Sequence, residues 1–405
     1  MGNKVKSKQK RTIIICLVLS ILLLAGSVFV IVDGLVHMND TYKKFEDVNF
    51  ARAFASALGK DTVRDLTDED IAKIESLVYS VQVGHDSTTG ALYAYPVVMM
   101  GYKEFTYDII NNVTDNAEDA AKEGKYFTFY HAITKSNDLN LFTNLRVLRT
   151  FDLAEISSMQ DDCNTTLNNY YMAMYGYSSV KYSDYMTFDQ LMSNCALTDL
   201  KNLSQLDNLT KLEQLSIEFT GISNLAGIEK FENLTKLDIG YTTVTDLSAL
   251  SSKTKLENLC LVAMGARDNA ATADEAASDD KKEDDKKEEE KHTHAGLTDI
   301  SAVSSLTELK HLNIAGNAIS DISAVKDLTK LESAVLNSNC IENLNAFANK
   351  PALKELFASG NHLTDISGIS GCGELTSFSA YENKLTDVSA LGSCTKLETL
   401  ALYTN

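Results

Sequence analysis

A 22-residue repeat of hydrophobic and polar positions dominates the second half of the chain. The phrase LTELKHLNIAGNAISDISAV begins at Leu306 and returns in related form from positions 328, 351 and 373. The leucine that leads each short apolar run recurs every 22 residues, at Leu309, Leu331, Leu353, Leu375 and Leu397. The same phase holds upstream at Leu212, Leu234 and Leu256, and the 53 residues from there to Leu309 equal one repeat plus 31. The pattern therefore predicts eight stacked units with one insertion.

Each unit contains three signals in a fixed order. The motif L-x-x-L-x-[LI] alternates with period two, which predicts a short strand with its leucines in the core. An asparagine follows at one position, giving a structural ladder of Asn317, Asn339, Asn361, Asn383 and Asn405, whose amides can satisfy backbone groups of neighbouring coils. T-D-[ILV]-S-[AG] then predicts a tight turn into a short 3₁₀ helix. We expect an α/β solenoid with a parallel sheet on its concave face.

The first apolar segment of the chain has a different character. Residues 13–32 hold 20 consecutive positions without charge, enough for a helix to span the hydrocarbon layer. Five cations precede it: Lys4, Lys6, Lys8, Lys10 and Arg11. We therefore predict a cytoplasmic basic tail (1–11), a single-pass transmembrane signal anchor (12–33), a juxtamembrane segment (34–47) and extracytoplasmic repeats. A cleaved signal peptide is the alternative, although its apolar core usually covers about 7–15 residues.

A second helical pattern follows the predicted anchor. Residues 49–77 combine an amphipathic run with a polar helix start at residues 66–70. We expect residues 48–81 to form a helical N-terminal cap that continues into a first strand at residues 74–81. Such a cap covers the apolar end of a solenoid, which would otherwise expose its core.

The repeats and the cap together resemble the 22-residue leucine-rich repeats of internalin-like surface proteins of Gram-positive bacteria. The resemblance covers residues 196–405 apart from the insertion, and the helical phrase at 49–77 resembles the cap that opens such domains. It implies a leucine-rich-repeat fold and non-covalent recognition at the cell surface. Two segments depart from the family pattern, and each carries its own prediction.

The first departure is residues 82–195, which we expect to be irregular around one degraded repeat whose strand lies at Leu145 and Leu148. The flanking stretches 82–140 and 157–195 hold 12 of the 17 tyrosines. Tyrosine enrichment can mark a binding surface, and it also fits rings that pack the insertions against the solenoid.

The second departure is the insertion at 267–295, which separates repeats at 196–266 from repeats at 296–405. Residues 268–294 contain 11 acidic residues and 5 lysines with little to bury, so we expect a solvated, disordered loop. His292 and His294 are expected to be loop histidines, and no metal site is predicted.

Charge and motifs exclude several functions. The net charge is −19, and beyond the five N-terminal cations 32 basic residues face 56 acidic ones, so the body is a poor nucleic-acid binder. No catalytic or cofactor motif is present, and we predict neither enzyme activity nor a cofactor. Cys372 and Cys394 are one repeat apart where two other units have leucine, so they are either buried apolar residues or a bridge between coils. Cys163 and Cys195 are the other possible pair.

A binding surface remains as the functional hypothesis. Residues between the core leucines face the concave side, and the candidate ligand-binding residues are Phe357, Tyr381, Tyr403, His311, Asn313 and Glu355. A protein, a peptide or a cell-wall polymer is the expected partner. The chain ends at Asn405 without a recognisable C-terminal cap. Two alternatives therefore stay open: the recognition arm of an enzyme whose catalytic module lies beyond residue 405, or a self-associating envelope protein. The oligomeric state is left open.

Overall fold

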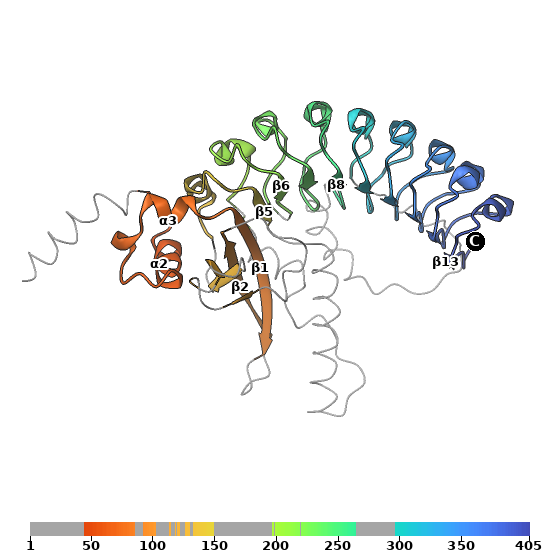
Figure 1. Cartoon of the computed structure of the whole chain (residues 1–405). Coiled ribbons are helices and arrows are strands. Elements are labelled where there is room, and N and C mark those ends of the chain that lie inside the picture. Colours follow the sequence, from red (N-terminus) through yellow and green to blue (C-terminus); the bar gives the residue numbers. More distant parts are fainter. Residues whose placement is uncertain are drawn as a thin grey trace, which may run out of the picture.

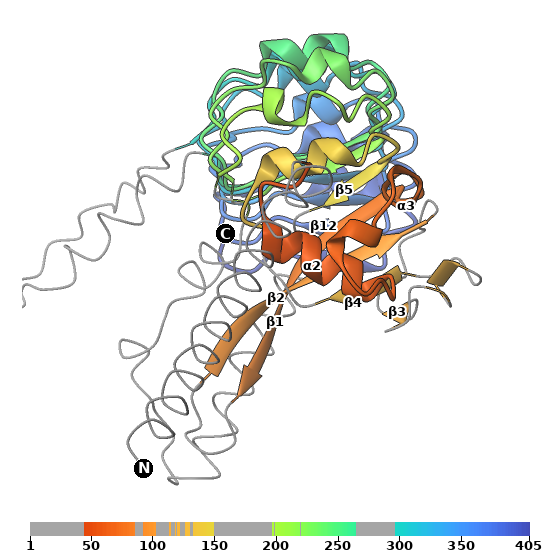
Figure 2. The same cartoon turned by 90° about the vertical axis from the view of Figure 1, so that its left-hand side faces the viewer.

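A computed structural model describes residues 44–85, 92–102, 113–114, 118, 120–121, 126–129, 133–149, 197, 199–218, 220–264 and 296–405. Figure 1 shows the repeats as an arch, with the strands along its inner side and short 3₁₀ helices along its outer side. Figure 2 looks along the stack of coils and places the cap helices at its near end.

The repeat strands form one continuous parallel sheet. They are β6 (Gln214–Ser216), β7 (Lys236–Asp238), β8 (Asn258–Cys260), β9 (His311–Asn313), β10 (Ser333–Val335), β11 (Glu355–Phe357), β12 (Ser377–Ser379) and β13 (Thr399–Ala401). Neighbouring strands pair in order, and Asn258 lies opposite His311. The insertion between β8 and β9 therefore leaves the register intact, as the shared repeat phase predicts.

The outer side carries one short 3₁₀ helix for each repeat. They are η5 (Leu203–Leu206), η6 (Ile228–Lys230), η7 (Ser248–Ser252), η8 (Ser301–Ser305), η9 (Ser323–Val325), η10 (Asn345–Phe347), η11 (Ser367–Gly371) and η12 (Ser389–Ser393). An aspartate before most of them accepts the backbone N–H two residues later, as Asp321 does from Ser323 at 2.8 Å. This hydrogen bond lowers the pKa of Asp321 and makes the turn that the T-D-x-S pattern predicts.

Between the sheet and the 3₁₀ helices lies a single apolar core. In each coil the strand leucine and its partners are almost fully buried, as Leu309, Leu312 and Ile314 are in the coil of β9. Burial of such a side chain contributes about 1.5–3 kcal/mol before entropy is counted. The repeated leucines therefore hold the coils together.

The cap consists of α2 (Val48–Ala57), η1 (Val63–Asp65) and α3 (Asp68–Ala72). Asp47 caps α2 by accepting the N–H groups of Asn49 and Phe50 at 3.0 and 2.9 Å. Phe50 and Phe54 lie edge-on to Phe142 of the first coil, with ring centroids 6.4 and 5.6 Å apart. The helices thus cover the apolar end of the solenoid.

The segment expected to be irregular contains regular structure. Strand β1 (Ser76–His85) extends beyond the predicted end at residue 81 and pairs antiparallel with β2 (Leu92–Gly101). Strand β2 pairs with β4 (Tyr126–Phe129), which pairs with β3 (Val113–Thr114). The prediction of irregular structure was wrong for these strands because an antiparallel hairpin has no 22-residue phase. In addition, Pro96 lies within β2, and a proline in a sequence usually indicates the end of a strand.

The degraded repeat forms a coil. It comprises η3 (Ser136–Leu141) and β5 (Val147–Arg149), and β5 pairs in parallel with both β1 and β6. Leu145 and Leu148 are fully buried. Strand β5 therefore joins the cap sheet to the repeats.

Several predictions concern residues outside the described part of the chain. These are the membrane span at 13–32, residues 157–195 with Cys163 and Cys195, and the charged loop at 267–295. Among the described residues, no helix is long and apolar enough to cross a membrane.

Candidate functional site on the concave face

Three columns of side chains line the concave face because each strand buries its middle residue and turns the flanking ones outward. The first column is Gln214, Lys236, Asn258, His311, Ser333, Glu355, Ser377 and Thr399. The second is Ser216, Asp238, Cys260, Asn313, Val335, Phe357, Ser379 and Ala401. The third, two residues after each strand, is Glu218, Gly240, Val262, Ala315, Asn337, Ser359, Tyr381 and Tyr403.

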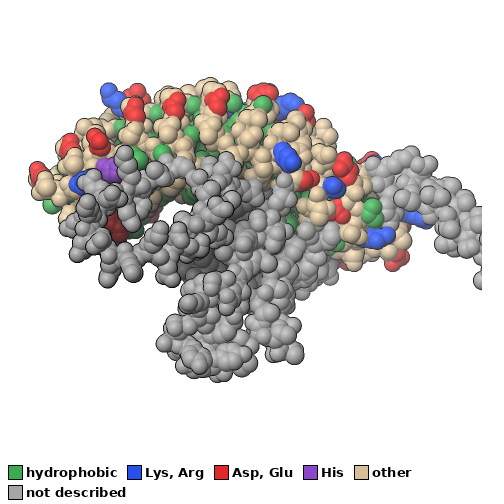
Figure 3. All heavy atoms as spheres, turned by 180° about the vertical axis from the view of Figure 1, so that it is seen from behind, with side chains coloured by type: hydrophobic (Ala, Val, Ile, Leu, Met, Phe, Trp, Pro, Cys, Tyr) green, Lys and Arg blue, Asp and Glu red, His purple; other side chains and the backbone are tan. Residues whose placement is uncertain are grey.

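Charge is distributed unevenly over these columns. The coils of β6 and β7 place Lys236, Asp238 and Glu218 in these columns, and Glu218 is fully buried. From β8 to β13 the columns have eighteen positions, and His311 and Glu355 are the only members of the Lys, Arg, His, Asp and Glu group among them. In a chain of net charge −19, this part of the concave face is close to uncharged. Acidic side chains instead recur along the outer ridge of the arch (Figure 3).

The predicted aromatic residues lie on three successive coils. Tyr381 and Tyr403 stack, with ring centroids 4.5 Å apart and planes inclined by 7°. Tyr403 is 60% exposed. Partial desolvation, Tyr381 and Glu382 raise the pKa of Tyr403, so its hydroxyl is protonated at neutral pH. Phe357 is half-buried in the second column of the preceding coil, where it pairs in register with Val335.

The predicted polar residues are dispersed. His311 and Glu355 are both exposed in the first column, and Ser333 separates them. They therefore form no acid–base pair. Asn313 lies beside His311 on β9, where its Oδ1 accepts the N–H of Ala315 at 3.1 Å.

The five ladder asparagines repeat one set of hydrogen bonds. Asn361 Nδ2 donates to the carbonyl of Leu336 in the preceding coil at 3.0 Å and to Ala358 in its own at 3.1 Å. Its Oδ1 accepts the N–H of Ile341 at 3.0 Å. Asn317, Asn339, Asn383 and Asn405 make equivalent contacts. These side chains join coils and do not face a ligand.

One group of metal-ligand types was not recognised as a group from the sequence. Potential ligand atoms of Glu218, Asp238 and Cys260, on adjacent coils, all lie within 4.8 Å of one another. Burial, Asp238 and Glu218 raise the pKa of the Cys260 thiol well above its usual range, and the thiol hydrogen bonds to Asp238. Proximity of three candidate ligand atoms does not by itself make a metal site, and we assign the group no metal role. The sequence could have indicated this group, because the three residues fall in the concave columns of three successive repeats.

The two described core cysteines are free thiols. Cys372 Sγ donates to the carbonyl of Phe347 at 3.5 Å, and Cys394 Sγ donates to Ile369 at 3.6 Å. Both thiols are directed at the preceding coil, and burial raises the pKa of Cys372 to about 11. Cys372 and Cys394 therefore act as buried apolar residues and do not form a disulfide between coils.

Two buried lysines occupy this same core position, and sequence reasoning missed them. Lys350 is fully buried and its Nζ donates to the carbonyls of Lys326 at 2.7 Å and Ala346 at 3.1 Å. Lys253 makes the same kind of contact with its preceding coil. Burial lowers the pKa of both ammonium groups. Both are bound to carbonyls inside the solenoid, so neither serves a surface site.

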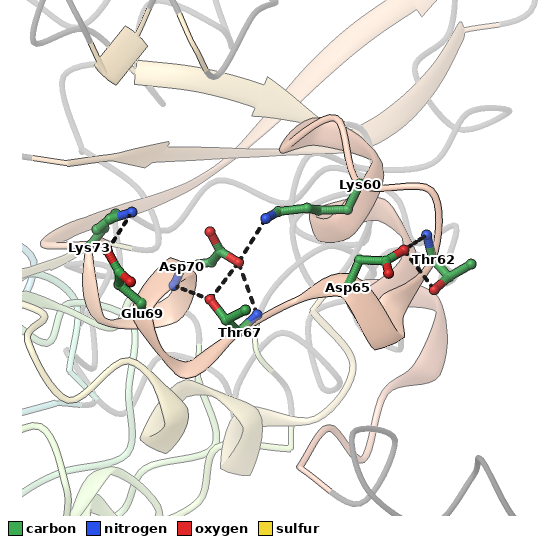
Figure 4. Close-up of polar contacts among 7 residues, drawn as sticks. All are labelled: Lys60, Thr62, Asp65, Thr67, Glu69, Asp70 and Lys73. Atoms are coloured by element: carbon green, nitrogen blue, oxygen red, sulfur yellow. Dashed lines mark hydrogen bonds and ion pairs between the residues drawn. The ribbon is translucent and has the colours of Figure 1, made fainter.

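A pocket of about 670 Å³ lies beside the cap and is lined in part by Lys60, Asp70, Lys73 and Tyr102. Figure 4 shows Lys60 reaching Asp70, an ion pair of 3.0 Å, while Asp70 accepts the N–H and hydroxyl of Thr67 at 2.9 and 2.8 Å. Burial opposes ionisation of Asp70, but these contacts outweigh it and lower its pKa. Burial and Asp70 raise the pKa of Tyr102 to about 12. The Asp70 carboxylate in this pocket is therefore already bound to Thr67 and Lys60 of the cap.

Comparison with known proteins places the fold. No protein-family model and no curated protein matches the chain. The structure is similar to an internalin (InlF) from Listeria monocytogenes, with a TM-score of 0.51 and 19% identity over 89% of this chain and 70% of that one.

Two further structures are similar at lower scores. Internalin C2 from the same organism has a TM-score of 0.37 and 23% identity over 49% of this chain and 76% of that one. The third structure is the ectodomain of the Arabidopsis thaliana receptor kinase GASSHO1/SCHENGEN3 in complex with CASPARIAN STRIP INTEGRITY FACTOR 2. It has a TM-score of 0.37 and 18% identity over 50% of this chain and 22% of that one. The likeness to InlF confirms the expected resemblance at the level of fold: the chain is an internalin-like leucine-rich-repeat solenoid.

Proposed function

We propose that the chain is a non-enzymatic recognition protein that binds a protein or peptide through the concave face from β8 to β13. The observation that carries this proposal is the Tyr381–Tyr403 stack, with Phe357 on the preceding coil, on an almost uncharged sheet face within an acidic protein. Exposed aromatic rings in contiguous positions are typical of the residues that dominate protein interfaces. A cell-wall polymer is a second candidate partner, since flat rings also pack against sugar faces.

The finer parts of this proposal concern location. We propose that residues 13–32 anchor the chain as a single-pass membrane protein, with the N-terminus in the cytoplasm and the repeats outside. Support comes from the length of the uncharged run and the five cations before it. Protease added to intact cells should digest the repeats, and repeats protected until lysis would refute this topology.

The binding site can be tested with peptides selected from a random phage-displayed library on the immobilised full chain. The triple variant Phe357→Ser, Tyr381→Ser and Tyr403→Ser should weaken the selected peptides roughly 100-fold, because it removes three candidate hot spots. Val388→Ser is the control, since it removes an exposed apolar side chain beside η12 on the outer side. Unchanged affinity of a folded triple variant would remove the concave face from consideration.

A further inference from the structure

Two asparagine amides on the concave face are fixed in orientation by backbone N–H groups. Asn313 Oδ1 accepts the N–H of Ala315 at 3.1 Å, within the coil of β9. Asn337 Oδ1 accepts the N–H of Ser359 at 2.8 Å, across to the next coil. A backbone N–H can only donate, so the atom facing it must be the amide oxygen. Each side chain therefore directs its NH₂ group away from the backbone that holds it.

These NH₂ groups are available as donors. In the described part of the chain neither Nδ2 donates a hydrogen bond, and both side chains are partly exposed. The ladder asparagines differ, because their Nδ2 atoms are bound to carbonyls in the core. Asn313 and Asn337 thus offer donors whose positions are set before any partner arrives, which lowers the entropy cost of binding.

Hydroxyl groups on the same face can act both as donors and as acceptors. Ser359 Oγ and Ser379 Oγ lie 2.7 Å apart, so one donates to the other and one hydroxyl proton remains free to donate. The two asparagine amides, whose donors are fixed in position, therefore favour a partner that brings acceptors.

Apolar contact and charge restrict that partner further. Val335 lies opposite Asn313 on one side and opposite Phe357 on the other, and Asn337 follows Val335 by two residues in the same coil. An anionic acceptor would meet Glu355 and a chain of net charge −19. A sugar hydroxyl and a peptide carbonyl can both accept a hydrogen bond from these NH₂ groups. An extended main chain also has side chains that can reach the apolar pair.

Building on the proposed function, we propose that this face binds an extended, uncharged polypeptide segment. Its main-chain carbonyls accept hydrogen bonds from Asn313 and Asn337, and one apolar side chain packs on Val335 and Phe357. Recognition rests on donors and apolar contact and does not depend on ion pairs, so affinity should change little with salt.

The test measures Kd for the selected library peptides with the double variant Asn313→Asp and Asn337→Asp. Aspartate keeps the oxygen that accepts the backbone N–H and replaces the donor with a second acceptor. We expect Kd to rise at least about tenfold, because a donor to a carbonyl becomes a repulsive oxygen. The matched control is Asn343→Asp, an exposed turn residue that accepts the N–H of Asn345 and stands where other coils have aspartate. Its Kd should match that of the unaltered chain.

The outcomes separate this inference from the function on which it rests. If the serine triple variant loses binding and the aspartate pair does not, the concave face binds peptides but the amide donors are not involved. If the selected peptides are charged and their affinity falls steeply between 0.15 and 1 M NaCl, the uncharged partner is wrong. If no peptide is enriched and a neutral glycan array is bound instead, a sugar occupies the face. Enrichment of uncharged peptides that are insensitive to salt and weakened by the aspartate pair supports the proposal.

Discussion

The repeats and the N-terminal cap are held together in different ways. In the repeats one contact recurs, as when Asn339 and Asn361 each bind a carbonyl of their own coil and one of the coil before. Where the cap meets the first coil each contact is made once: the fully buried Asp138 of η3 accepts the N–H groups of Glu46 and Asp47 at 2.7 and 2.8 Å. Stability in the repeats is therefore a sum of similar neighbour terms, whereas the cap depends on single buried groups.

The same comparison extends to side-chain packing. The cap packs on the first coil through a cluster of phenylalanines that occurs once: Phe45, Phe50, Phe54 and Phe142. The repeats instead use the same leucine position in coil after coil. A lesion in a repeat should thus disturb the adjoining coils, and a lesion in the cap should disturb the start of the solenoid.

The largest expected effect comes from closing the space between two coils. A Cβ at Gly368 would lie 2.0 Å from the carbonyl oxygen of Leu344, a backbone atom that can move only with its coil. We expect Gly368→Ala to cost about 3 kcal/mol or more. Hydrogen exchange should show lost protection from η10 to β13 while α2 keeps its protection.

Gly392→Ala is the matched control in the following coil. A Cβ there meets nothing within 4 Å, so we expect no loss of stability in chemical denaturation. Uniform loss of protection in Gly368→Ala, including the cap, would show that the whole domain unfolds as one unit and not coil by coil.

The second effect compares two members of the asparagine ladder. Asn361→Ala should cost about 2–3 kcal/mol, because it leaves buried groups of Ile341 and Leu336 without their partner. Asn405→Ala removes the same contacts at an exposed position and should cost about 1 kcal/mol. Equal costs in urea denaturation would mean that burial does not set the strength of the ladder.

The repeats could be predicted from the sequence in more detail than the segments that have no repeated copy. The 22-residue phase predicted the concave columns because alternation and repetition both constrain them, so Phe357 and Tyr381 were found without a structure. Strand β2 was missed because it pairs antiparallel and has no repeated copy. The orientation of Asn337 was also inaccessible, because it depends on the Ser359 N–H of the next coil. Sequence pattern gives a residue's column, and its hydrogen-bond partners decide what it presents to a ligand.

Acidification should affect the two regions in opposite directions. In the repeats, hydrogen bonds from Ser248, Ser323 and Ser389 lower the pKa of the preceding turn aspartates, so their stabilisation is present above the unfolded pKa near 3.8 and is lost as pH falls through the lowered value. Where the cap meets the first coil, burial raises the pKa of Asp138 despite its two backbone hydrogen bonds to Glu46 and Asp47. Its contribution therefore becomes more favourable as pH falls through that raised value.

This contrast can be followed by hydrogen exchange between pH 5 and pH 3. We expect the turns of the repeats to lose protection first and the Glu46 and Asp47 amides to keep theirs. Asp321→Asn should reduce the acid sensitivity of its own turn, because Asn343 makes the same turn without a titrating group. Earlier loss of protection at Glu46 and Asp47 than in the repeats would contradict the assigned signs.

The smallest expected effect concerns the ion pairs along the edge of the sheet. Lys354 Nζ lies 2.6 Å from Glu332 on the neighbouring coil, but its side chain is 57% exposed, so Lys354→Gln should leave the denaturation midpoint unchanged. Arg146 differs because it binds Glu213 through two hydrogen bonds of 2.9 and 2.8 Å at the coil that joins cap to repeats. Arg146→Gln should cost about 1 kcal/mol at low salt and less at 0.5 M NaCl. If Lys354→Gln proved as costly as Arg146→Gln, the repeats too would depend on single charged contacts, and the distinction between the two regions would fail.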